Sequence, residues 1–125
     1  MRILYIFLLA FISAQQIKVN VDRNKIYEGE SIVYTINVKD GDTPNVDLSL
    51  LKDFSIVSGP NSSTNMEWIH GKYSSTHSLS WVLMPEKIGK LLIPSIKIKI
   101  KNKSYRTSKI NITVLSLNKN DNNNN

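Results

Sequence analysis

The 125-residue sequence predicts an all-β fold in which antiparallel strands pack as a β-sandwich of about seven strands. Three observations support this fold class. Apolar and polar residues alternate in most segments, turn signals recur at intervals of roughly ten residues, and no amphipathic helix stands out. The pattern is typical of an immunoglobulin-like sandwich, although the chain has no cysteine and therefore lacks the disulfide of true immunoglobulin domains.

The N-terminus has the features of a secretory signal peptide over residues 1–14. Arg2 supplies one positive charge, an unbroken apolar run follows from Ile3 to Ile12, and small residues lead to Ala14. This run is shorter than the ~20 residues that a helix needs to cross a bilayer. We therefore expect cleavage after Ala14, export of the mature chain, and no transmembrane anchor in the remaining chain.

The predicted domain spans residues 15–116 and begins with two strands and a loop. Residues 16–22 alternate cleanly, and Ser31–Val38 follows as a stronger strand after a turn at Gly29. Lys39–Pro44 is the clearest loop of the chain. The next segment, Val46–Leu51, fits either a strand or a short helical turn.

The middle of the chain predicts a short strand and then a long hairpin. Phe54–Ser58 forms the short strand, which Gly59 and Pro60 are expected to end. Ser62–Ile69 then pairs with Lys72–Met84 around a tip at His70 and Gly71. Trp81, near the end of the second arm, is the expected central residue of the core.

The C-terminal half predicts two further strands after a turn at residues 85–90. The first runs from Leu91 to Lys101, where three isoleucines alternate with three lysines, and the second runs from Tyr105 to Leu115. Alternation of this kind places the isoleucines in the core and the ammonium groups in water. The asparagine-rich residues 117–125 have too little apolar content to fold and are expected to form a disordered tail.

The charge is unevenly distributed. The net charge is +6, yet residues 22–53 hold seven acidic and four basic residues, whereas residues 87–109 hold eight basic residues and no acidic one. The candidate partner-binding surface is a basic strand formed by Lys97, Lys99, Lys101 and Lys103. Solubility with protection of a strand edge, an acidic protein partner, and an anionic membrane surface all remain open as explanations.

No catalytic, cofactor-binding or metal-ligating set emerges from the motifs. His70 and His77 lie seven residues apart with only Glu67 nearby, and the carboxylates of the turns lack the spacing of a calcium loop. The sequence contains no Gly-x-Ser-x-Gly elbow and no phosphate-binding glycine loop. The basic strand also lacks interleaved aromatic residues for nucleic-acid bases. We therefore expect no enzyme activity, cofactor, nucleic acid or small-molecule substrate.

Several segments, in this order and spacing, resemble the N-terminal domain of the BatD oxygen-tolerance family. The matching segments are Val21–Glu30, Leu48–Phe54, the serine-rich hairpin around Gly71, Met84–Pro94, Lys103–Thr107 and Ile110–Leu115. The resemblance implies an exported protein of immunoglobulin-like domains that supports envelope stress resistance or aerotolerance as a scaffold. It also implies membrane or periplasmic partners. The von Willebrand A-type Bat proteins are candidates, because family members are encoded beside them and beside a MoxR-type ATPase.

The resemblance carries over no catalytic residue, because the matching positions have structural roles. Gly29 and Gly89 serve turns, Pro85 and Pro94 mark strand boundaries, and Tyr105 packs in the core. Family members continue through further domains and a transmembrane helix, so a shortened product of a longer protein remains open.

Three functions follow as hypotheses. The first is a non-enzymatic scaffold that docks another envelope protein through a strand edge or the basic strand. The alternative is a carbohydrate-binding or adhesion module at the cell surface, which requires Trp68 and Tyr73 to form an exposed platform. The third, a hydrolase, requires a serine hydroxyl within ~3 Å of His77 and a carboxylate that orients the imidazole.

Overall fold

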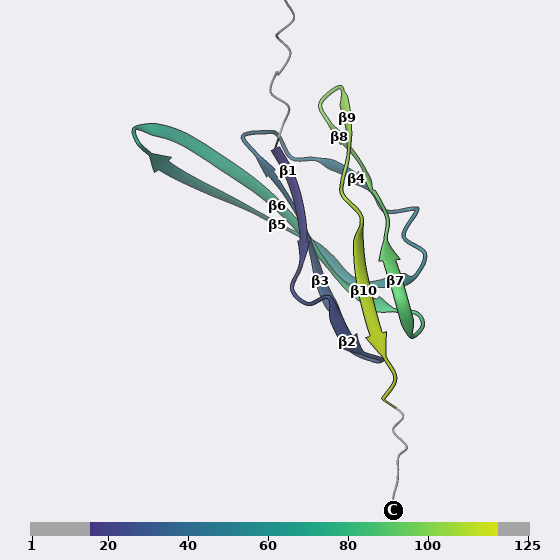
Figure 1. Ribbon diagram of the computed structural model, residues 1–125. Helices are drawn as coiled ribbons and strands as arrows, with labels where there is room; N and C mark the ends of the chain where they lie inside the picture. The colour runs from purple at the N-terminus through teal and green to yellow at the C-terminus, as the bar shows by residue number, and fades with distance from the viewer. Residues whose placement is uncertain (1–15, 118–125) are drawn as a thin grey trace, which may run out of the picture.

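The computed structural model describes residues 16–117, which fold into ten strands (Figure 1). Their bounds are β1 Gln16–Val21, β2 Lys25–Tyr27, β3 Ile32–Lys39, β4 Asn45–Asp47, β5 Phe54–Ile69, β6 Lys72–Pro85, β7 Gly89–Ile93, β8 Lys97–Ile100, β9 Lys103–Arg106 and β10 Ile110–Leu115.

The strands form two layers, which confirms the predicted β-sandwich. One layer is a four-stranded antiparallel sheet in the order β1-β3-β6-β5. The other consists of two three-stranded sheets, β2-β10-β7 and β4-β8-β9, which lie on the opposite side of the core in Figure 1. All strand pairs are antiparallel except β2 with β10.

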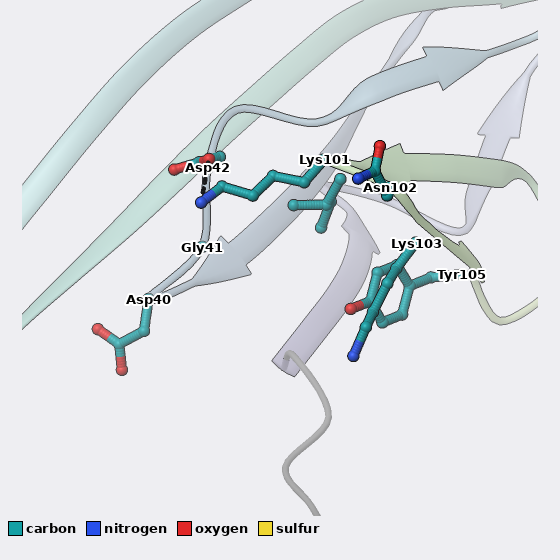
Figure 2. Close-up of a pocket in the computed structure, with 8 residues that line it drawn as sticks. Asp40, Gly41, Asp42, Lys101, Asn102, Lys103 and Tyr105 are labelled. Carbon is teal, nitrogen blue, oxygen red and sulfur yellow. Dashed lines mark ion pairs between the residues drawn. The ribbon is translucent and has the colours of Figure 1, made fainter.

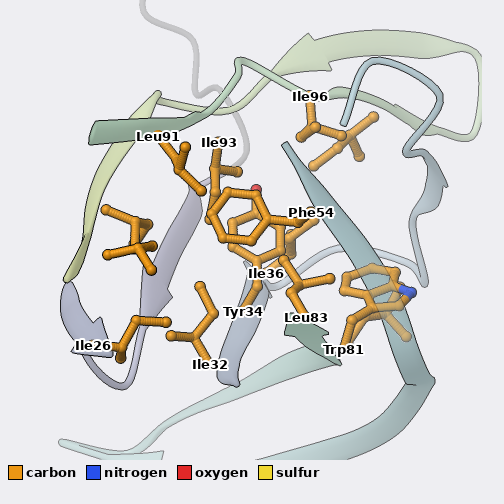
Figure 3. Close-up of a cluster of buried hydrophobic side chains, with 14 of the residues drawn as sticks. Ile26, Ile32, Tyr34, Ile36, Phe54, Trp81, Leu83, Leu91, Ile93 and Ile96 are labelled. Carbon is orange, nitrogen blue, oxygen red and sulfur yellow. The ribbon is translucent and has the colours of Figure 1, made fainter. Parts of the chain in front are cut away.

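The core lies between the layers and follows the alternation of the sequence. In β3 the side chains of Ile32, Tyr34, Ile36 and Val38 are buried, and the residues between them are exposed or half-buried. Burial of each such side chain contributes about 1.5–3 kcal/mol. Leu91, Ile93 and Ile96 approach from the second layer, as Figure 3 shows.

Trp81 is buried in β6, as predicted, and its ring lies 6.2 Å from that of Tyr34. Further along β6, Leu83 is fully buried. The strand therefore carries the centre of the core over its second half.

β5 and β6 continue beyond the end of β3 as a two-stranded hairpin. The last pair between β3 and β6 joins Lys39 with Thr76, while β5 and β6 stay paired up to Ile69 and Lys72. We call residues 66–75 the arm; it projects away from both layers in Figure 1. His70 and Gly71 close it with φ values of 52° and 76°, as a two-residue hairpin turn requires, so the predicted tip is confirmed.

The predicted strand end at Gly59 and Pro60 is wrong. β5 is one strand of 16 residues, and its register with β6 shifts between Ile56 and Asn61 instead of breaking. Gly59 makes this continuation possible, because a Cβ at this position would lie 2.7 Å from the Ser80 carbonyl oxygen and 2.9 Å from the Trp81 Cα. The chain thus passes over β6 where only glycine fits.

The two long strands predicted in the C-terminal half are also wrong, because each is divided between two sheets. The first breaks between β7 and β8, where Pro94 has no N–H for a ladder. The second breaks between β9 and β10 at Thr107. Polar groups at one break form hydrogen bonds with polar groups at the other. Thr107 N–H donates to the Ile96 carbonyl (3.0 Å), and Ile96 N–H donates to Thr107 Oγ1 (2.8 Å). These two divisions add two strands, the short strands β2 and β4 add two more, and the continuity of β5 removes one, so the structure has ten strands instead of about seven.

The segment Val46–Leu51, predicted as either a strand or a short helical turn, contains the end of a strand followed by a turn. Asn45–Asp47 forms the short strand β4, and a turn follows in which Leu51 N–H donates to the Leu48 carbonyl at 3.0 Å. The predicted signal peptide lies outside the described residues, as does residue 118 onward of the predicted tail.

Replacement of Gly59 by alanine is expected to destabilise the domain more than the same change at Gly89. Both glycines have positive φ values, 114° and 109°, but a Cβ at Gly89 would meet no atom within 4 Å. The two variants therefore share the backbone strain, and only Gly59→Ala adds the clash with β6. We expect Gly59→Ala to lower the free energy of unfolding by about 1–3 kcal/mol more than Gly89→Ala.

Urea unfolding followed by circular dichroism measures this difference. Equal loss of stability in the two variants would contradict the close packing of Gly59 on β6.

Candidate functional site

The arm carries a cluster of exposed apolar side chains on one face. Trp68 and Tyr73 lie directly opposite each other in the hairpin, with ring centroids 5.2 Å apart and an interplanar angle of 57°. The Tyr73 hydroxyl donates to the sulfur of Met66 at 2.6 Å. We call Met66, Trp68 and Tyr73 the arm cluster.

This cluster continues the core face of the sheet. Tyr73, Leu79 and Trp81 occupy alternate positions of β6, so their side chains leave the sheet on the same side. Leu79 and Trp81 are buried by the second layer, whereas Trp68 is 71% exposed and Tyr73 is 51% exposed. The arm therefore extends a core-type face past the end of its cover.

A loop connects the base of the arm to the second layer. Asp40 N–H donates to the Ser75 carbonyl at 2.7 Å, and Ser75 N–H donates to Asp40 Oδ1 at 3.1 Å. Lys101 Nζ forms an ion pair with Asp42 Oδ2 at 3.4 Å (Figure 2). Residues 40–42 thus fix the turn between β8 and β9 close to the base of the arm.

An open, polar cavity of about 420 Å³ lies between this loop and the β8–β9 turn. Its lining includes Asp40, Asp42, Lys101, Lys103 and Tyr105. In Figure 2 the Lys101 side chain reaches towards Asp42, while the Asp40 carboxylate points away from it. Lys101 is paired with Asp42, and Asp40 accepts a hydrogen bond from the Ser75 N–H, so these charged groups already have partners within the domain.

The free edge of β5 is the longest unprotected strand edge of the four-stranded sheet. From Asn61 to Ile69 the strand pairs with β6 without a register shift, and no described strand pairs with its other side. Glu67 is the only charged residue in these nine positions. Natural edges are usually blocked by lysine, proline or bulges, and this segment has none of them.

The structure does not bring the four predicted lysines into one row. Lys97 and Lys99 are exposed on the outer face of β8, between β4 and β9. Lys101 lies in the turn with a φ of 56° and pairs with Asp42, and Lys103 lies on β9 opposite Ile100. The predicted isoleucine partners Ile96, Ile98 and Ile100 are all buried.

The outer face of β8 is also less positive than the sequence suggests. Asp47 on β4 lies opposite Lys97. The Ser49 N–H donates to Asp47 Oδ1 at 3.0 Å and holds the pKa of this carboxyl below its usual value, with a smaller contribution from Lys97. Asp47 therefore stays ionised and partly neutralises the basic strand. The partner-binding role of the four lysines stays a prediction.

The histidines are placed apart. His70 lies at the tip of the arm, and His77 Nδ1 lies 3.0 Å from Thr64 Oγ1, its partner across the hairpin. The hydroxyl beside His77 is thus that of a threonine rather than the serine that the hydrolase hypothesis requires. Within residues 16–117, no three His, Asp or Glu side chains gather as a metal site would require.

The comparison with family models gives a match over residues 19–114 to the BatD DUF11 like domain. The chain belongs to the BatD family. The match covers β2 to β9 completely, half of β1 and most of β10, so the family domain and the sandwich coincide. Searches of curated proteins and of solved structures gave no match. No helix in the described part of this BatD domain is long and apolar enough to span a membrane.

Sequence reasoning missed two features of this BatD domain. The continuity of β5 was hidden because Gly59 and Pro60 are turn residues in most contexts. The buried Thr107, which joins the β7–β8 and β9–β10 breaks, gave no signal of its own. The structural roles that the resemblance implies are confirmed for Gly29, which has a φ of 89°, and for Tyr105, which packs against the core.

Tyr34 is a buried ionisable group in the core. Its hydroxyl has no hydrogen bond of normal geometry within the described chain. Burial raises the pKa of the phenol, and the neighbouring Thr107 hydroxyl offsets this only in part. The environment disfavours the phenolate, so Tyr34 is suited to packing and not to proton transfer.

Replacement of Tyr34 by phenylalanine is expected to preserve or raise stability at neutral pH, by up to about 1 kcal/mol, because it removes a poorly satisfied buried hydroxyl. The pKa of Tyr34 is higher in the folded state, so the unfolded chain loses this proton first as the pH rises. Wild-type stability is therefore expected to fall relative to Tyr34→Phe above about pH 10.

Urea unfolding of both proteins from pH 7 to pH 11 measures this difference, and the comparison cancels the titration of the other groups. A stability difference that does not change with pH would contradict the raised pKa.

Proposed function

We propose that this BatD domain is a non-enzymatic interaction module that acts as a scaffold in the bacterial cell envelope, in stress or oxygen tolerance. Membership of the BatD family supports the proposal. The signal-like residues 1–14 favour export to the periplasm. The partners are membrane or periplasmic proteins, with von Willebrand A-type Bat proteins as the first candidates.

The observation that carries the proposal is the free edge of β5. An extended segment of a partner can add to this edge as a further strand, and backbone hydrogen bonds then supply most of the affinity. The nine residues from Asn61 to Ile69 pair in regular register and present a single charge, so a partner strand meets little electrostatic repulsion. Such binding needs no catalytic or metal-binding side chain.

The carbohydrate alternative is favoured by one feature of the arm and disfavoured by another. Trp68 is 71% exposed, as that function requires. Its ring crosses that of Tyr73 at 57°, so the two rings form a wedge and not the flat platform on which a sugar stacks. We therefore retain the scaffold as the proposed function.

Two lysines introduced into the β5 edge are expected to abolish partner capture. The test variant is Ser63→Lys with Asn65→Lys, because charged side chains on an edge strand hinder pairing with another chain. The matched control is Ser74→Lys with Thr76→Lys, which adds the same charge to the same face of the sheet on β6 and leaves the free edge of β5 unchanged.

A chain from Gln15 to Asn125 serves for this test, because it keeps every described strand and every buried residue. It is immobilised and exposed to a detergent extract of cell membranes, and captured von Willebrand A-type protein is detected by mass spectrometry. Wild type and control are expected to retain this protein, and the edge variant to lose most of it.

A third variant with glutamate at positions 97, 99, 101 and 103 tests the basic strand. If the edge variant still captures the protein and the four-glutamate variant does not, the docking surface lies on β8 and β9 instead of on the β5 edge. No capture by the folded wild type would reject the scaffold function.

A further inference from the structure

The tip of the arm carries exposed apolar side chains on both faces. The arm cluster of Met66, Trp68 and Tyr73 occupies one face, and Ile69, which is 47% exposed, leaves the hairpin on the other. A partner strand would bind along one edge of the hairpin, and a flat ligand would bind on one of its faces. Neither kind of binding requires apolar side chains on both faces. Apolar side chains on both faces, next to the charged Lys72, suit shallow entry of the tip into a membrane interface.

The arm lies at a positively charged end of the molecule. β1 starts at this end, because Gln16 pairs with Lys39, and the β8–β9 turn lies here through the ion pair of Lys101 with Asp42. This region contains six lysines and three carboxylates. They are Lys18, Lys39, Lys72, Lys99, Lys101 and Lys103, and Asp40, Asp42 and Glu67.

The opposite end is electrically balanced. It contains β2, the end of β10 and the β6–β7 turn, which lie at the bottom of Figure 1. Five basic and five acidic residues occur there, namely Arg23, Lys25, Lys52, Lys87 and Lys90 with Asp22, Glu28, Glu30, Asp53 and Glu86. The charge of the domain is therefore polarised towards the arm.

We infer that the arm is a membrane-contacting element whose tip enters the headgroup region of an anionic bilayer. Tryptophan and tyrosine prefer this region because each combines an apolar ring with a polar group. Lys72, next to the tip, extends its ammonium group towards lipid phosphates while its carbon chain stays among apolar groups. The lysines of the same end supply attraction to anionic lipid.

The geometry sets the depth of insertion. The free edge of β5 has backbone groups that β6 does not satisfy, and these groups cannot enter the hydrocarbon region without a large free-energy penalty. Glu67 lies two residues before Ile69 and marks the level at which the arm must be in water or among headgroups. The insertion is therefore shallow and limited to residues 68–73.

The contact with lipid goes beyond the scaffold function and does not depend on it. An arm seated on the membrane would orient the sandwich with its arm end towards the bilayer and with the end of β10 away from it.

The two tryptophans make the inference directly measurable. Trp68 is exposed, and Trp81 is 5% exposed in the core, so a change in emission on binding reports Trp68 while Trp81 reports the fold. The chain from Gln15 to Asn125 is used, because the apolar run Ile3–Ile12 would itself bind lipid. The probe is a vesicle of phosphatidylcholine with about 30% phosphatidylglycerol, compared with pure phosphatidylcholine.

We expect the anionic vesicles to shift the emission of the wild type to shorter wavelength and to carry the protein into the pellet on sedimentation. Trp68→Phe should remove the shift and keep most of the binding. Trp68→Ser should weaken binding about tenfold, because it removes the largest inserted side chain. The matched control is Tyr27→Ser, which removes an aromatic residue of 48% exposure at the opposite end and should bind like the wild type.

Charge is tested by a second matched pair. Lys101→Glu with Lys103→Glu changes the arm end, and Lys87→Glu with Lys90→Glu makes the same charge change at the opposite end. Each double variant breaks one ion pair of 3.4 Å, to Asp42 or to Asp53. Only the first is expected to lose binding to anionic vesicles.

Three results would overturn the inference. One is the absence of an emission shift with anionic vesicles, and another is equal binding by Trp68→Ser and the wild type. The third is a shift of Trp68 emission that appears with insoluble polysaccharide or on self-association but not with lipid. Such a shift would show that the arm binds a glycan or a second copy of the chain. Loss of vesicle binding with intact capture of a protein partner would remove the lipid contact alone.

Discussion

The pairing of β5 with β6 is the interaction on which both the core and the arm depend. β6 is an internal strand, held between β3 and β5, and its second half carries Leu79, Trp81 and Leu83 into the core. Its first residues, 72–75, have no β3 beside them, so β5 is their only neighbouring strand. Because alternate residues of a strand face the same side, the core face must continue along the arm. The exposed cluster is the direct result of a strand pair that is longer than the sandwich covering it.

The second layer depends on a different constraint, the exchange of strands between two small sheets. The chain leaves one sheet after β7 and returns to it at β10, and both passages occur where Thr107 bonds to Ile96. A buried chain break leaves backbone groups without a ladder partner, and each would be costly if unpaired. The Ser95 hydroxyl adds a further bond to the Thr107 carbonyl at 2.6 Å. These contacts let Ile96, Ile98 and Ile100 stay in the core although their strand has changed sheet.

Much of the fold was predictable from the sequence, because period-two alternation fixes which residues are buried. Ile32, Tyr34, Ile36 and Val38 were correctly placed on one buried face of β3, and the hairpin tip at His70 and Gly71 was located to the residue. Strand ends were less predictable. Gly59 is a turn signal in local sequence, and only its tertiary contact with Ser80 and Trp81 shows that the strand continues. The free edge from Asn61 to Ile69 lies in the predicted hairpin arm, but its lack of a second neighbour follows from the strand order β1-β3-β6-β5, which local sequence does not reveal.

The arm cluster stabilises the hairpin, but this stabilisation is too small to explain why so much apolar surface is exposed. A two-stranded hairpin is marginally stable in water, and a cross-strand aromatic pair such as Trp68 with Tyr73 stabilises it by about 0.5–1.5 kcal/mol. Packing of this pair leaves most of Trp68 in water, at 71% exposure, and Ile69 on the other face contributes nothing to it. Threonine or valine pairs stabilise hairpins by comparable amounts with far less exposed apolar surface. A partner or a membrane that covers the tip gives this exposed surface a function, and the lysines at the same end favour an anionic one.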